Sequence, residues 1–461
     1  MFGLFLGLCL WKFGNPVILD QKISAPASAA EFLNFAWPTH WANWIFLPLA
    51  VAGIALILVR REPRPTVSRF HRPMFWLPPL LWFGWQLVSA TQTVDAELTA
   101  TVLGQFAGCA ASYFLGALLI GAPGAGAKTG QPRALYFLLI GVLAAFAFCL
   151  VRAADQRLFE FPQTRQMLEA GERAHWTNFP PETLAQMKRE NVIVTTNGVD
   201  IANPVFLAKF AKDRVSGTLV YPNALAGTVL LLGPASLTLA FGARKLRPTI
   251  RYAVVALTIF LVGGGLFWSG SKAGWLIALG LGGLYLLRLR WPAKLKVAAL
   301  LTVAVLGLGI FAVRFHHYFA AGARSVGARL DYWRAALQTT GNNPLFGTGP
   351  GTFQRPYAQL KSPDAEMARL AHNDYLEQFS DSGVPGGIFY LAWIAPALVF
   401  IGRKVWNGEG REFTGGPGAL YFALFAGLLG WFLQGLGEFE LYIPALAWTA
   451  FTLLGCLAAL T

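Results

Sequence analysis

Long apolar runs, separated by short polar or basic stretches, make up most of the chain. A helix that crosses a bilayer needs about 20 mainly apolar residues. Twelve runs approach that length, so we predict an all-α polytopic integral membrane protein with about 12 transmembrane helices. The predicted spans are 2–19, 43–59, 75–92, 98–121, 134–151, 217–241, 252–268, 272–288, 296–314, 384–402, 418–435 and 441–460.

The first of these runs is the weakest, because it contains Lys12. It is either a retained span or a signal peptide, although no small-residue cleavage site directly follows its apolar part.

The composition agrees with a membrane protein and excludes an ordinary soluble domain. Hydrophobic residues make up 55% of the 461 positions and charged residues only 13%, whereas about a quarter of a globular protein is charged. The cysteines all lie inside apolar runs and show no metal-ligand spacing: Cys9, Cys109, Cys149 and Cys456. We expect them to be small buried hydrophobic residues.

The basic residues predict the orientation of the chain. They gather in one alternating set of loops, 60–74, 122–133, 242–251, 288–296 and 403–417, and the net charge is +14. The short loops of the opposite set contain a single basic residue, Lys22; these loops are 20–42, 93–97, 269–271 and 436–440. Because basic loops of membrane proteins stay on the cytoplasmic side, both termini are predicted to be cytoplasmic.

Two long loops, 152–216 and 315–383, then face outward. Each mixes both charge signs and contains a helix-like stretch, "PETLAQMKREN" in the first and "RLDYWRAALQ" in the second. Loops of this length are usually functional. We predict three parts: an N-terminal bundle with the first long loop (1–213), a central region with the second (214–402) and a C-terminal helix pair (403–461).

Polar stretches with candidate chemistry all fall on the predicted outer side. The stretch 213–227 contains Arg214 and Asn223, and the tight turn 268–275 contains Lys272. Each cation is either an interfacial anchor that reaches lipid headgroups or a ligand for a phosphate-bearing substrate.

The second long loop carries Arg324, Arg329 and Arg334 at five-residue spacing. On a helix this spacing rotates successive side chains by about 140°, so they cannot all face one ligand. Arg329 precedes Trp333 by four positions, which allows a cation–π contact. The following "GTGPGTF" forms tight turns or offers N–H groups to an anion, and it is not a Walker A motif.

His372 stands in "AHNDYLEQFSDSGVPGG", where Asn373 or Asp374 can cap a short helix that Gly383 and Pro385 interrupt. The histidine is either a passive interfacial residue or a base at the membrane surface. No pattern in the chain resembles a metal site.

In order and spacing, these stretches resemble the signatures of the O-antigen ligase/polymerase superfamily. The similar stretches are "RVSGTLVYPNALAG", "SGSKAGW", "RLDYWRAAL", "NPLFGTGPGTF" and "AHNDYLEQFSDSGVPGG", within 214–402. The resemblance implies a GT-C-like membrane glycosyltransferase at the periplasmic face of the bacterial inner membrane. It also implies an undecaprenyl-pyrophosphate-linked glycan as donor, with no metal, cofactor or nucleotide sugar.

The resemblance further assigns roles to residues. It implies that His372 activates the acceptor hydroxyl and that Arg329 holds pyrophosphate, with Arg324 near enough to compete. Lys272 stands where members commonly carry arginine. Arg214 is also expected to bind pyrophosphate, and the expected supporting residues are Asn373, Asp374, Asn223 and Trp333. One displacement would invert the anomeric centre, since the outer loops offer no obvious carboxylate nucleophile.

Several functions stay open at this point. The acceptor is lipid A–core for a ligase, another lipid-linked repeat for a polymerase, or a protein. A small-anion transporter is the alternative outside enzymes, and a scaffold is a third. A transporter needs ionisable groups inside several spans, and the predicted span interiors are nearly free of charge apart from Lys12. The expected partners are the lipid-linked donor, the acceptor and membrane lipids, with no nucleic acid.

Overall fold

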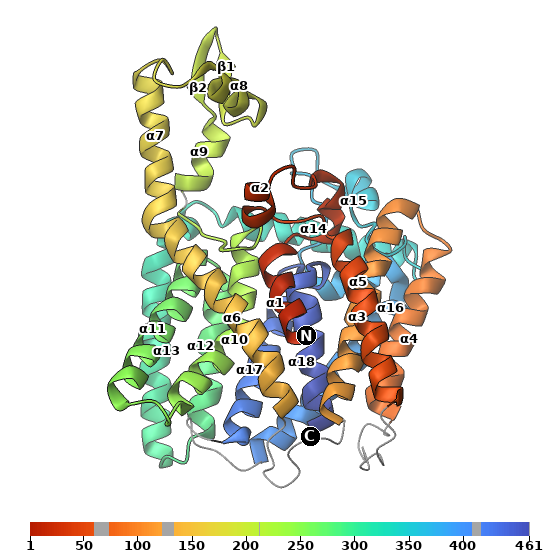
Figure 1. Cartoon of the computed structure of the whole chain (residues 1–461). Coiled ribbons are helices and arrows are strands. Elements are labelled where there is room, and N and C mark those ends of the chain that lie inside the picture. Colours follow the sequence, from red (N-terminus) through yellow and green to blue (C-terminus); the bar gives the residue numbers. More distant parts are fainter. Residues whose placement is uncertain (60–72, 122–132, 212, 408–415, 461) are drawn as a thin grey trace.

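The computed structural model describes residues 1–59, 73–121, 133–211, 213–407 and 416–460, and these residues are mostly helical. The basic loops predicted at 60–74, 122–133 and 403–417 lie largely outside the described residues. The other two basic loops, 242–251 and 288–296, are described and lie at one end of the helix bundle (Figure 1).

Within the described residues, seven helices are long and apolar enough to cross a membrane. The chain is therefore a multi-pass membrane protein. These helices are α5 (Ala96–Gly121), α6 (Arg133–Asp155), α10 (Pro222–Gly242), α11 (Pro248–Ser269), α13 (Ala293–Ala320), α16 (Asp374–Asn407) and α17 (Pro417–Gln434).

Each of the other five predicted spans also coincides with a helix. These helices are α1 (Phe2–Lys12), α3 (His40–Val59), α4 (Pro73–Ala90), α12 (Lys272–Arg288) and α18 (Pro444–Leu460). The prediction of one continuous span at 2–19 is wrong, because α1 ends at Lys12 and the short helix η1 (Val17–Lys22) follows Pro16. A helix of 11 residues measures about 16 Å, roughly half of a bilayer's hydrocarbon thickness.

Lys12 has a structural role at the end of α1. Its side chain is buried, and its ammonium group donates to the carbonyls of Leu33 (2.6 Å) and Phe35 (3.1 Å). It also lies 4.4 Å from the centre of the Trp11 ring. Lys12 thus binds the segment around α2 (Ala29–Asn34) to the bundle. The same charge is what made the first apolar run an ambiguous span.

Glycines bring the central helices into close contact. A Cβ atom at Gly455 of α18 would collide with the carbonyl of Tyr113 on α5, and one at Gly427 of α17 would collide with the carbonyl of Leu231 on α10. Small residues drive helix packing in membranes because they let backbones approach closely. The well-buried helices α10, α17 and α18 therefore form a closely packed centre.

The first long outer loop is a small folded arm. Helix α6 continues through a π-helical turn (Gln156–Glu160) into α7 (Phe161–Arg173), which stands above the bundle in Figure 1. The helix predicted in "PETLAQMKREN" is confirmed as α8 (Pro181–Arg189). The antiparallel hairpin of β1 (Ile193–Thr196) and β2 (Val199–Ala202), with Ile193 opposite Ala202, and then α9 (Pro204–Ala211) complete the arm.

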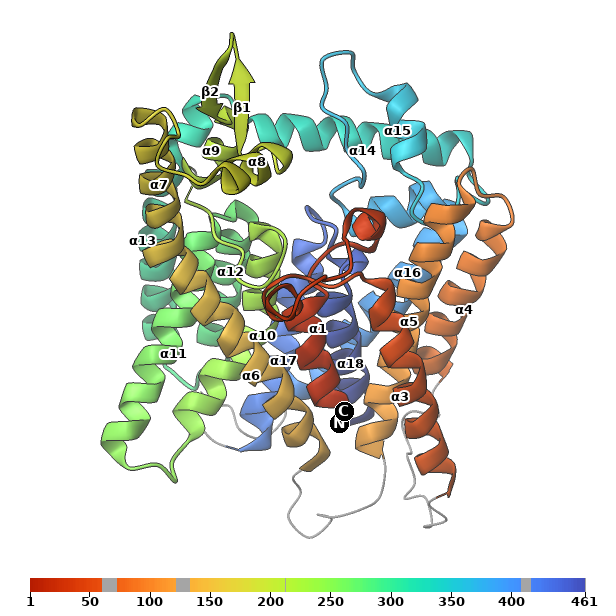
Figure 2. The same cartoon turned by 45° about the horizontal axis from the view of Figure 1, so that its top comes forward.

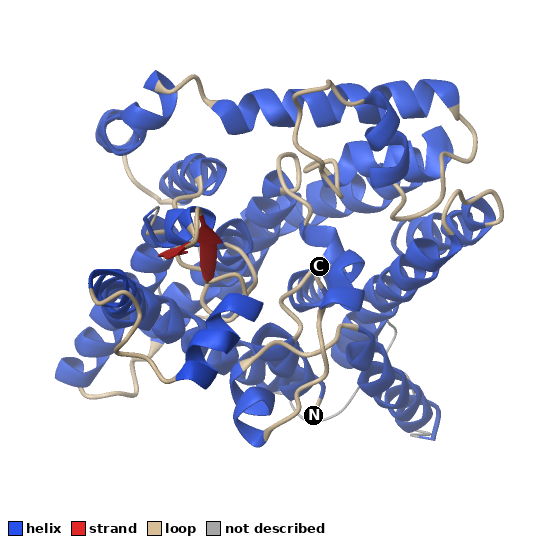
Figure 3. Cartoon of the chain, turned by 90° about the horizontal axis from the view of Figure 1, so that it is seen from above, coloured by secondary structure: helices blue, strands red, loops and turns tan. Residues whose placement is uncertain are grey.

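The second long outer loop contains α14 (Arg324–Asn342) and α15 (Gln354–Leu360), which confirms the helix expected in "RLDYWRAALQ". Helix α14 lies across the end of the bundle that carries the arm (Figures 2 and 3).

The glycine-rich stretch after α14 forms tight turns, as one of the two interpretations predicted. Gly347, Gly349 and Gly351 all have positive φ angles. The N–H groups of Gly349 and Gly351 donate to the carbonyl and carboxylate oxygens of Asp381, at 2.8 and 2.7 Å. Both donors are therefore paired within the protein and are not available to a substrate anion.

We predict that reporter fusions at positions 190 and 345 will show a periplasmic location and a fusion at 246 a cytoplasmic one. Positions 190 and 345 belong to the segments at the arm end of the bundle, and 246 belongs to the basic loop at the opposite end. Paired phosphatase and fluorescent-protein fusions measure this. A cytoplasmic signal at 345 would contradict the orientation that loop charge predicts.

Candidate active site

A buried carboxylate, that of Glu438, lies at the centre of the candidate site. It belongs to the turn between α17 and the short helix η3 (Glu440–Tyr442), and only 2% of its side chain is exposed. Arg329 forms an ion pair with it, and the Asn223 side-chain amide donates to its Oε1 at 2.7 Å. The Nδ1 atom of His372 lies 3.5 Å from its Oε2. Three predicted site residues from three separate segments thus meet at one carboxylate.

Among the three arginines at five-residue spacing, Arg329 is the one that reaches this centre. Its Nε also donates to the carbonyl of Gly437 at 2.9 Å. Arg324 is exposed at the start of α14, and Arg334 pairs with Asp331 at 2.8 Å. The predicted rotation between successive arginines is confirmed, and it separates Arg329 from the other two.

Arg214 joins the same network through Asn223. Its Nε donates to the carbonyl of Ser269 at 2.7 Å, and its Nη2 donates to the Asn223 side-chain oxygen at 2.5 Å. Burial lowers the pKa of Arg214, and the charge of Glu438 acts in the opposite direction. The charges of Arg329 and Arg314 lie close enough to lower that pKa further. Arginine nevertheless stays protonated in proteins, so the site holds a group of fixed positive charges.

Lys272 follows by three positions Ser269, whose carbonyl accepts from Arg214, and its side chain reaches toward α13. It is the first residue of α12, after Ser271, whose hydroxyl caps the helix by accepting from the Gly274 N–H at 3.2 Å. Its ammonium group is 3.8 Å from the centre of the Tyr318 ring and 5.2 Å from that of Phe315. The guanidinium of Arg314 lies 5.5 Å from the same Phe315 ring. Lys272 and Arg314 together extend the positive charge along the outer end of α13.

His372 is held by its backbone and by aromatic neighbours. Its φ angle of 51° is in the left-handed region, which is uncommon for residues other than glycine and often marks a functional position. The ring of Tyr332 stacks on it at 5.7 Å, and the ring of Phe439 meets it edge-on at 4.6 Å. Its Nδ1 is buried while 29% of its side chain is exposed, so the accessible part of the ring lies away from Nδ1.

The residues after His372 tie it to the turn that carries Glu438. The side-chain oxygen of Asn373 accepts from the N–H groups of Tyr375 and Leu376, at 3.1 and 3.0 Å, so Asn373 is the residue that caps α16. The buried carboxyl of Asp374 accepts from the Leu441 N–H at 3.3 Å, and its own N–H donates to the Gly435 carbonyl at 2.8 Å.

Two further contacts hold this segment. The Ala371 N–H donates to Glu377 at 3.0 Å. The expected break at Gly383 is confirmed, because this residue has φ 70° and ψ −177° within α16.

One contact that the sequence allowed is not formed, and two residues of the site were missed. The structure shows no cation–π contact between Arg329 and Trp333; the indole N–H of Trp333 instead points to the carbonyl of His372 at 3.4 Å. Glu438 was not among the predicted site residues. The sequence feature that could have identified Glu438 is the pair of acids in the short segment "GEFE". Charged residues beside a membrane span usually have a partner in the protein. Arg314 was also missed, since it ends a predicted span.

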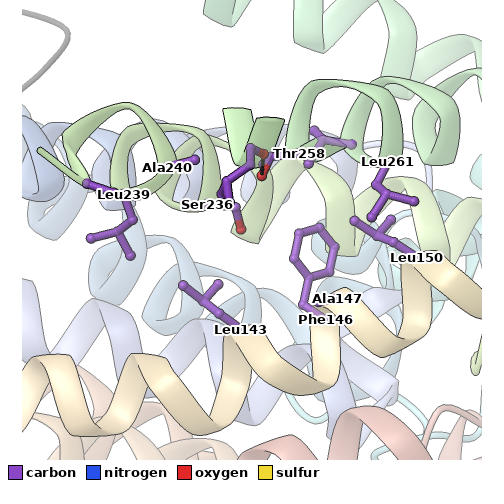
Figure 4. A pocket seen from close by; sticks show the side chains of 12 residues that line it. Leu143, Phe146, Ala147, Leu150, Ser236, Leu239, Ala240, Thr258 and Leu261 are labelled. Carbon is purple, nitrogen blue, oxygen red and sulfur yellow. Dashed lines mark hydrogen bonds between the residues drawn. The ribbon is translucent and has the colours of Figure 1, made fainter. Parts of the chain in front are cut away.

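The recess between α6, α10 and α11 has a different character from the site. Its lining includes Leu143, Phe146 and Leu150 (Figure 4). The hydroxyls of Ser236 and Thr258 each donate to a carbonyl of their own helix, at 3.0 and 2.8 Å. The recess offers no charged side chain, so it is a hydrophobic surface and not a place for phosphate chemistry.

Residues 256–391 match the family model described as O-antigen ligase. The match confirms the resemblance to the O-antigen ligase/polymerase superfamily. It includes Lys272, Arg329 and His372, and it leaves Arg214, Asn223 and Glu438 outside. No curated protein matches the chain closely enough to count as a relative.

We predict that Glu438→Ala will destabilise the protein by about 2–3 kcal/mol, because hydrogen bonds to a charged group are lost and partly buried donors stay unpaired. Thermal unfolding of the purified protein in detergent measures this as a lower Tm. Glu366→Ala is the control, since Glu366 is an exposed glutamate of the same outer face. Equal Tm values for the two variants would show that the carboxylate does not hold the site together.

Proposed function

We propose that this chain, which carries an O-antigen ligase domain, transfers a glycan from an undecaprenyl-pyrophosphate carrier to an acceptor hydroxyl. The reaction takes place at the periplasmic face of the bacterial inner membrane, on a GT-C-like fold with lipid A–core as the acceptor. The observation that carries this proposal is the meeting of Arg329, His372 and, through Asn223, Arg214 at the buried carboxylate of Glu438.

In this proposal the arginines bind the pyrophosphate of the donor. In both Arg329 and Arg214, the Nε and Nη2 groups donate hydrogen bonds to acceptors of the protein. Neither Nη1 group has a partner among the described residues, so it can bind the substrate. Guanidinium groups pair with phosphate oxygens through parallel hydrogen bonds. Glu438 and Asn223 hold the two side chains in place before the substrate arrives, which lowers the entropy cost of reaching the reactive geometry. Lys272 adds positive charge nearby.

His372 is the proposed base. A proton on Nδ1 directed toward Glu438 leaves the lone pair on Nε2, the other ring nitrogen. The separation of 3.5 Å is longer than a strong hydrogen bond, and such contacts often tighten only when substrate binds.

The proposed reaction is then a single displacement. Nε2 takes the proton of the acceptor hydroxyl while its oxygen attacks the anomeric carbon. The bond from that carbon to the pyrophosphate oxygen breaks, and the lipid pyrophosphate leaves with the electron pair, stabilised by the arginines. The anomeric centre is inverted, and the scheme needs no metal, cofactor or nucleotide.

A small-anion carrier is disfavoured by the groups next to the site. Asp374, Glu377 and Asp381 are buried in α16, and Glu440 is buried beside them. Helix α16 begins ten residues before the predicted span at 384, so the three acids of α16 lie outside that predicted span, whose residues 384–402 carry no charge. These buried groups are acidic, and acidic groups offer an anion no attraction.

The acceptor class has its own test in the glycans of a deletion strain. Free lipid-linked polymer together with unmodified lipid A–core supports a ligase. Lipid A–core that carries a single repeat indicates a polymerase. An unchanged lipopolysaccharide with loss of glycosylated protein indicates transfer to protein.

We predict that His372→Ala will lower the transfer rate by about 10²–10⁴-fold, the usual contribution of a general base, with little change in donor binding. His372→Gln keeps a hydrogen-bonding group but cannot take up a proton, so it should be nearly as defective. Transfer assays with purified enzyme and lipid-linked donor measure both, and the exposed His317 gives the control variant His317→Ala. Wild-type turnover by His372→Gln would mean that the histidine only orients the acceptor.

We predict that Arg329→Ala will abolish transfer and that Arg329→Lys will restore little of it, because an ammonium group cannot replace the planar guanidinium. Arg324→Ala is the matched control from the same helix, and it should keep most of the activity since Arg324 is exposed at the start of α14. The opposite pattern, an inactive Arg324→Ala and an active Arg329→Ala, would move the pyrophosphate to the outer face of α14.

A further inference from the structure

Helix α14 exposes a row of large apolar side chains. Val326, Leu330 and Leu337 are 48%, 56% and 58% exposed. At 100° per residue, positions separated by four and by seven lie within about 40° of one another around a helix. The three side chains therefore form one stripe, and no described part of the chain covers it. We call these three residues the α14 stripe.

Two other parts of the α14 surface contact the rest of the protein. Tyr332, Ala335, Ala336 and Thr339 are buried against the protein. The carboxylate of Asp331 accepts from Tyr357 at 3.0 Å and from Ser362 at 3.2 Å. The segment that begins with α15 thus contacts the polar face at Asp331, and it rises above α14 in Figure 2. The α14 stripe consequently points neither at the bundle nor at this segment but sideways, to the surroundings of the protein.

The neighbouring helix sets the level of α14. Helix α13 has 28 residues, which gives about 42 Å of helix against roughly 30 Å of bilayer hydrocarbon. Its outer end bears Tyr318 and Phe319, aromatic residues of the kind that concentrate at membrane–water interfaces. The Tyr318 hydroxyl donates to the Ala323 carbonyl at 3.1 Å and lies 2.6 Å from the Ser325 hydroxyl. Helix α14 therefore starts at the level of the lipid headgroups and runs across the outer end of the bundle (Figure 3).

We propose that α14 lies in the outer lipid–water interface, with the α14 stripe against the acyl chains of the bilayer. A helix with one apolar and one polar face takes this position because the bilayer covers the apolar face while the polar face stays in water. The apolar surface also continues onto α13, where Val313 is 76% and Phe319 50% exposed. Because most of α13 already faces lipid, the occupant that covers the stripe is bilayer lipid.

This position has a consequence for the site, which rests on the proposed function. Arg329 is one residue before Leu330 and projects from the side of α14 that faces the turn at Gly437 and Glu438. A helix held at the interface by its stripe fixes the guanidinium at the depth of lipid phosphate groups. The lipid-linked pyrophosphate would then meet Arg329 without leaving the membrane.

Single-cysteine labelling tests the position of α14 without any enzymatic assay. The four native cysteines are buried and free, so an added surface cysteine reacts selectively with an environment-sensitive fluorophore. Leu337→Cys and Gln338→Cys are the matched pair. The two positions are adjacent along the helix axis and point in directions that differ by about 100° around it. Both side chains are exposed. The full chain is reconstituted in phosphatidylcholine nanodiscs that contain lipids with a nitroxide on the acyl chain near the headgroup.

The expected result is quenching at position 337 that is roughly twofold or more stronger than at 338, with blue-shifted emission at 337, as for an interfacial helix. Leu330→Cys repeats the test one turn away, so one poorly folded variant does not decide the outcome. Equal quenching at 337 and 338 would overturn the proposal. Blue-shifted emission at 337 without quenching would also overturn it, since a protein partner would then cover the stripe. Neither result depends on whether the chain transfers glycans, so a failed transfer assay would count only against the proposed function.

Discussion

The pairing of the Glu438 carboxylate with Arg329 is the interaction on which the outer end of this protein depends. A buried charge is costly unless it is paired and hydrogen-bonded, and Glu438 is almost fully enclosed. Asn223 supplies a second donor and links the carboxylate to Arg214, while His372 approaches it from a third side. One carboxylate thereby fixes the relative positions of two cations and the proposed base, which come from segments far apart in the sequence.

The position of the Glu438 carboxylate depends on the close packing of the helices beneath it. Glu438 lies in the turn between α17 and η3, and α17 and α18 are buried against α10 and α5 through glycine contacts. Gly227 of α10 has no side chain, and a Cβ atom there would collide with the carboxyl group of Glu440. The packed centre therefore determines where the turn stands. The outer loops, which contribute Arg329 and His372, close over it.

The membrane gives the two long outer loops different roles. The first folds as an arm with its own small core around Trp176, above the bundle. The second stays at the surface of the bundle, where α14 turns Arg329 toward Glu438 and its apolar stripe outward. An anionic headgroup and an apolar tail need both kinds of surface next to each other. In the proposed arrangement, the fold places positive charge and an apolar helix face next to each other.

The sequence by itself determined the features that depend on local physics. The length of apolar runs located a helix within every predicted span, since a helix must satisfy its backbone hydrogen bonds within its own segment in lipid. The five-residue spacing showed that Arg324, Arg329 and Arg334 cannot all face one ligand, since helical rotation is a local property; only the fold decided that Arg329 is the one that reaches Glu438. The break at Gly383 and a cap at Asn373 or Asp374 were visible for the same reason. The order of the motifs gave the superfamily.

Only the tertiary structure decided which groups meet. Glu438 and Arg329 are 109 residues apart, and nothing in the short acidic turn "GEFE" indicates its partner. The role of Lys12 at the end of a short helix depends on the carbonyls of Leu33 and Phe35, which composition cannot reveal. Long-range pairing follows from how helices pack around close glycine contacts, and a one-dimensional pattern of apolar and polar residues carries no information about those distances.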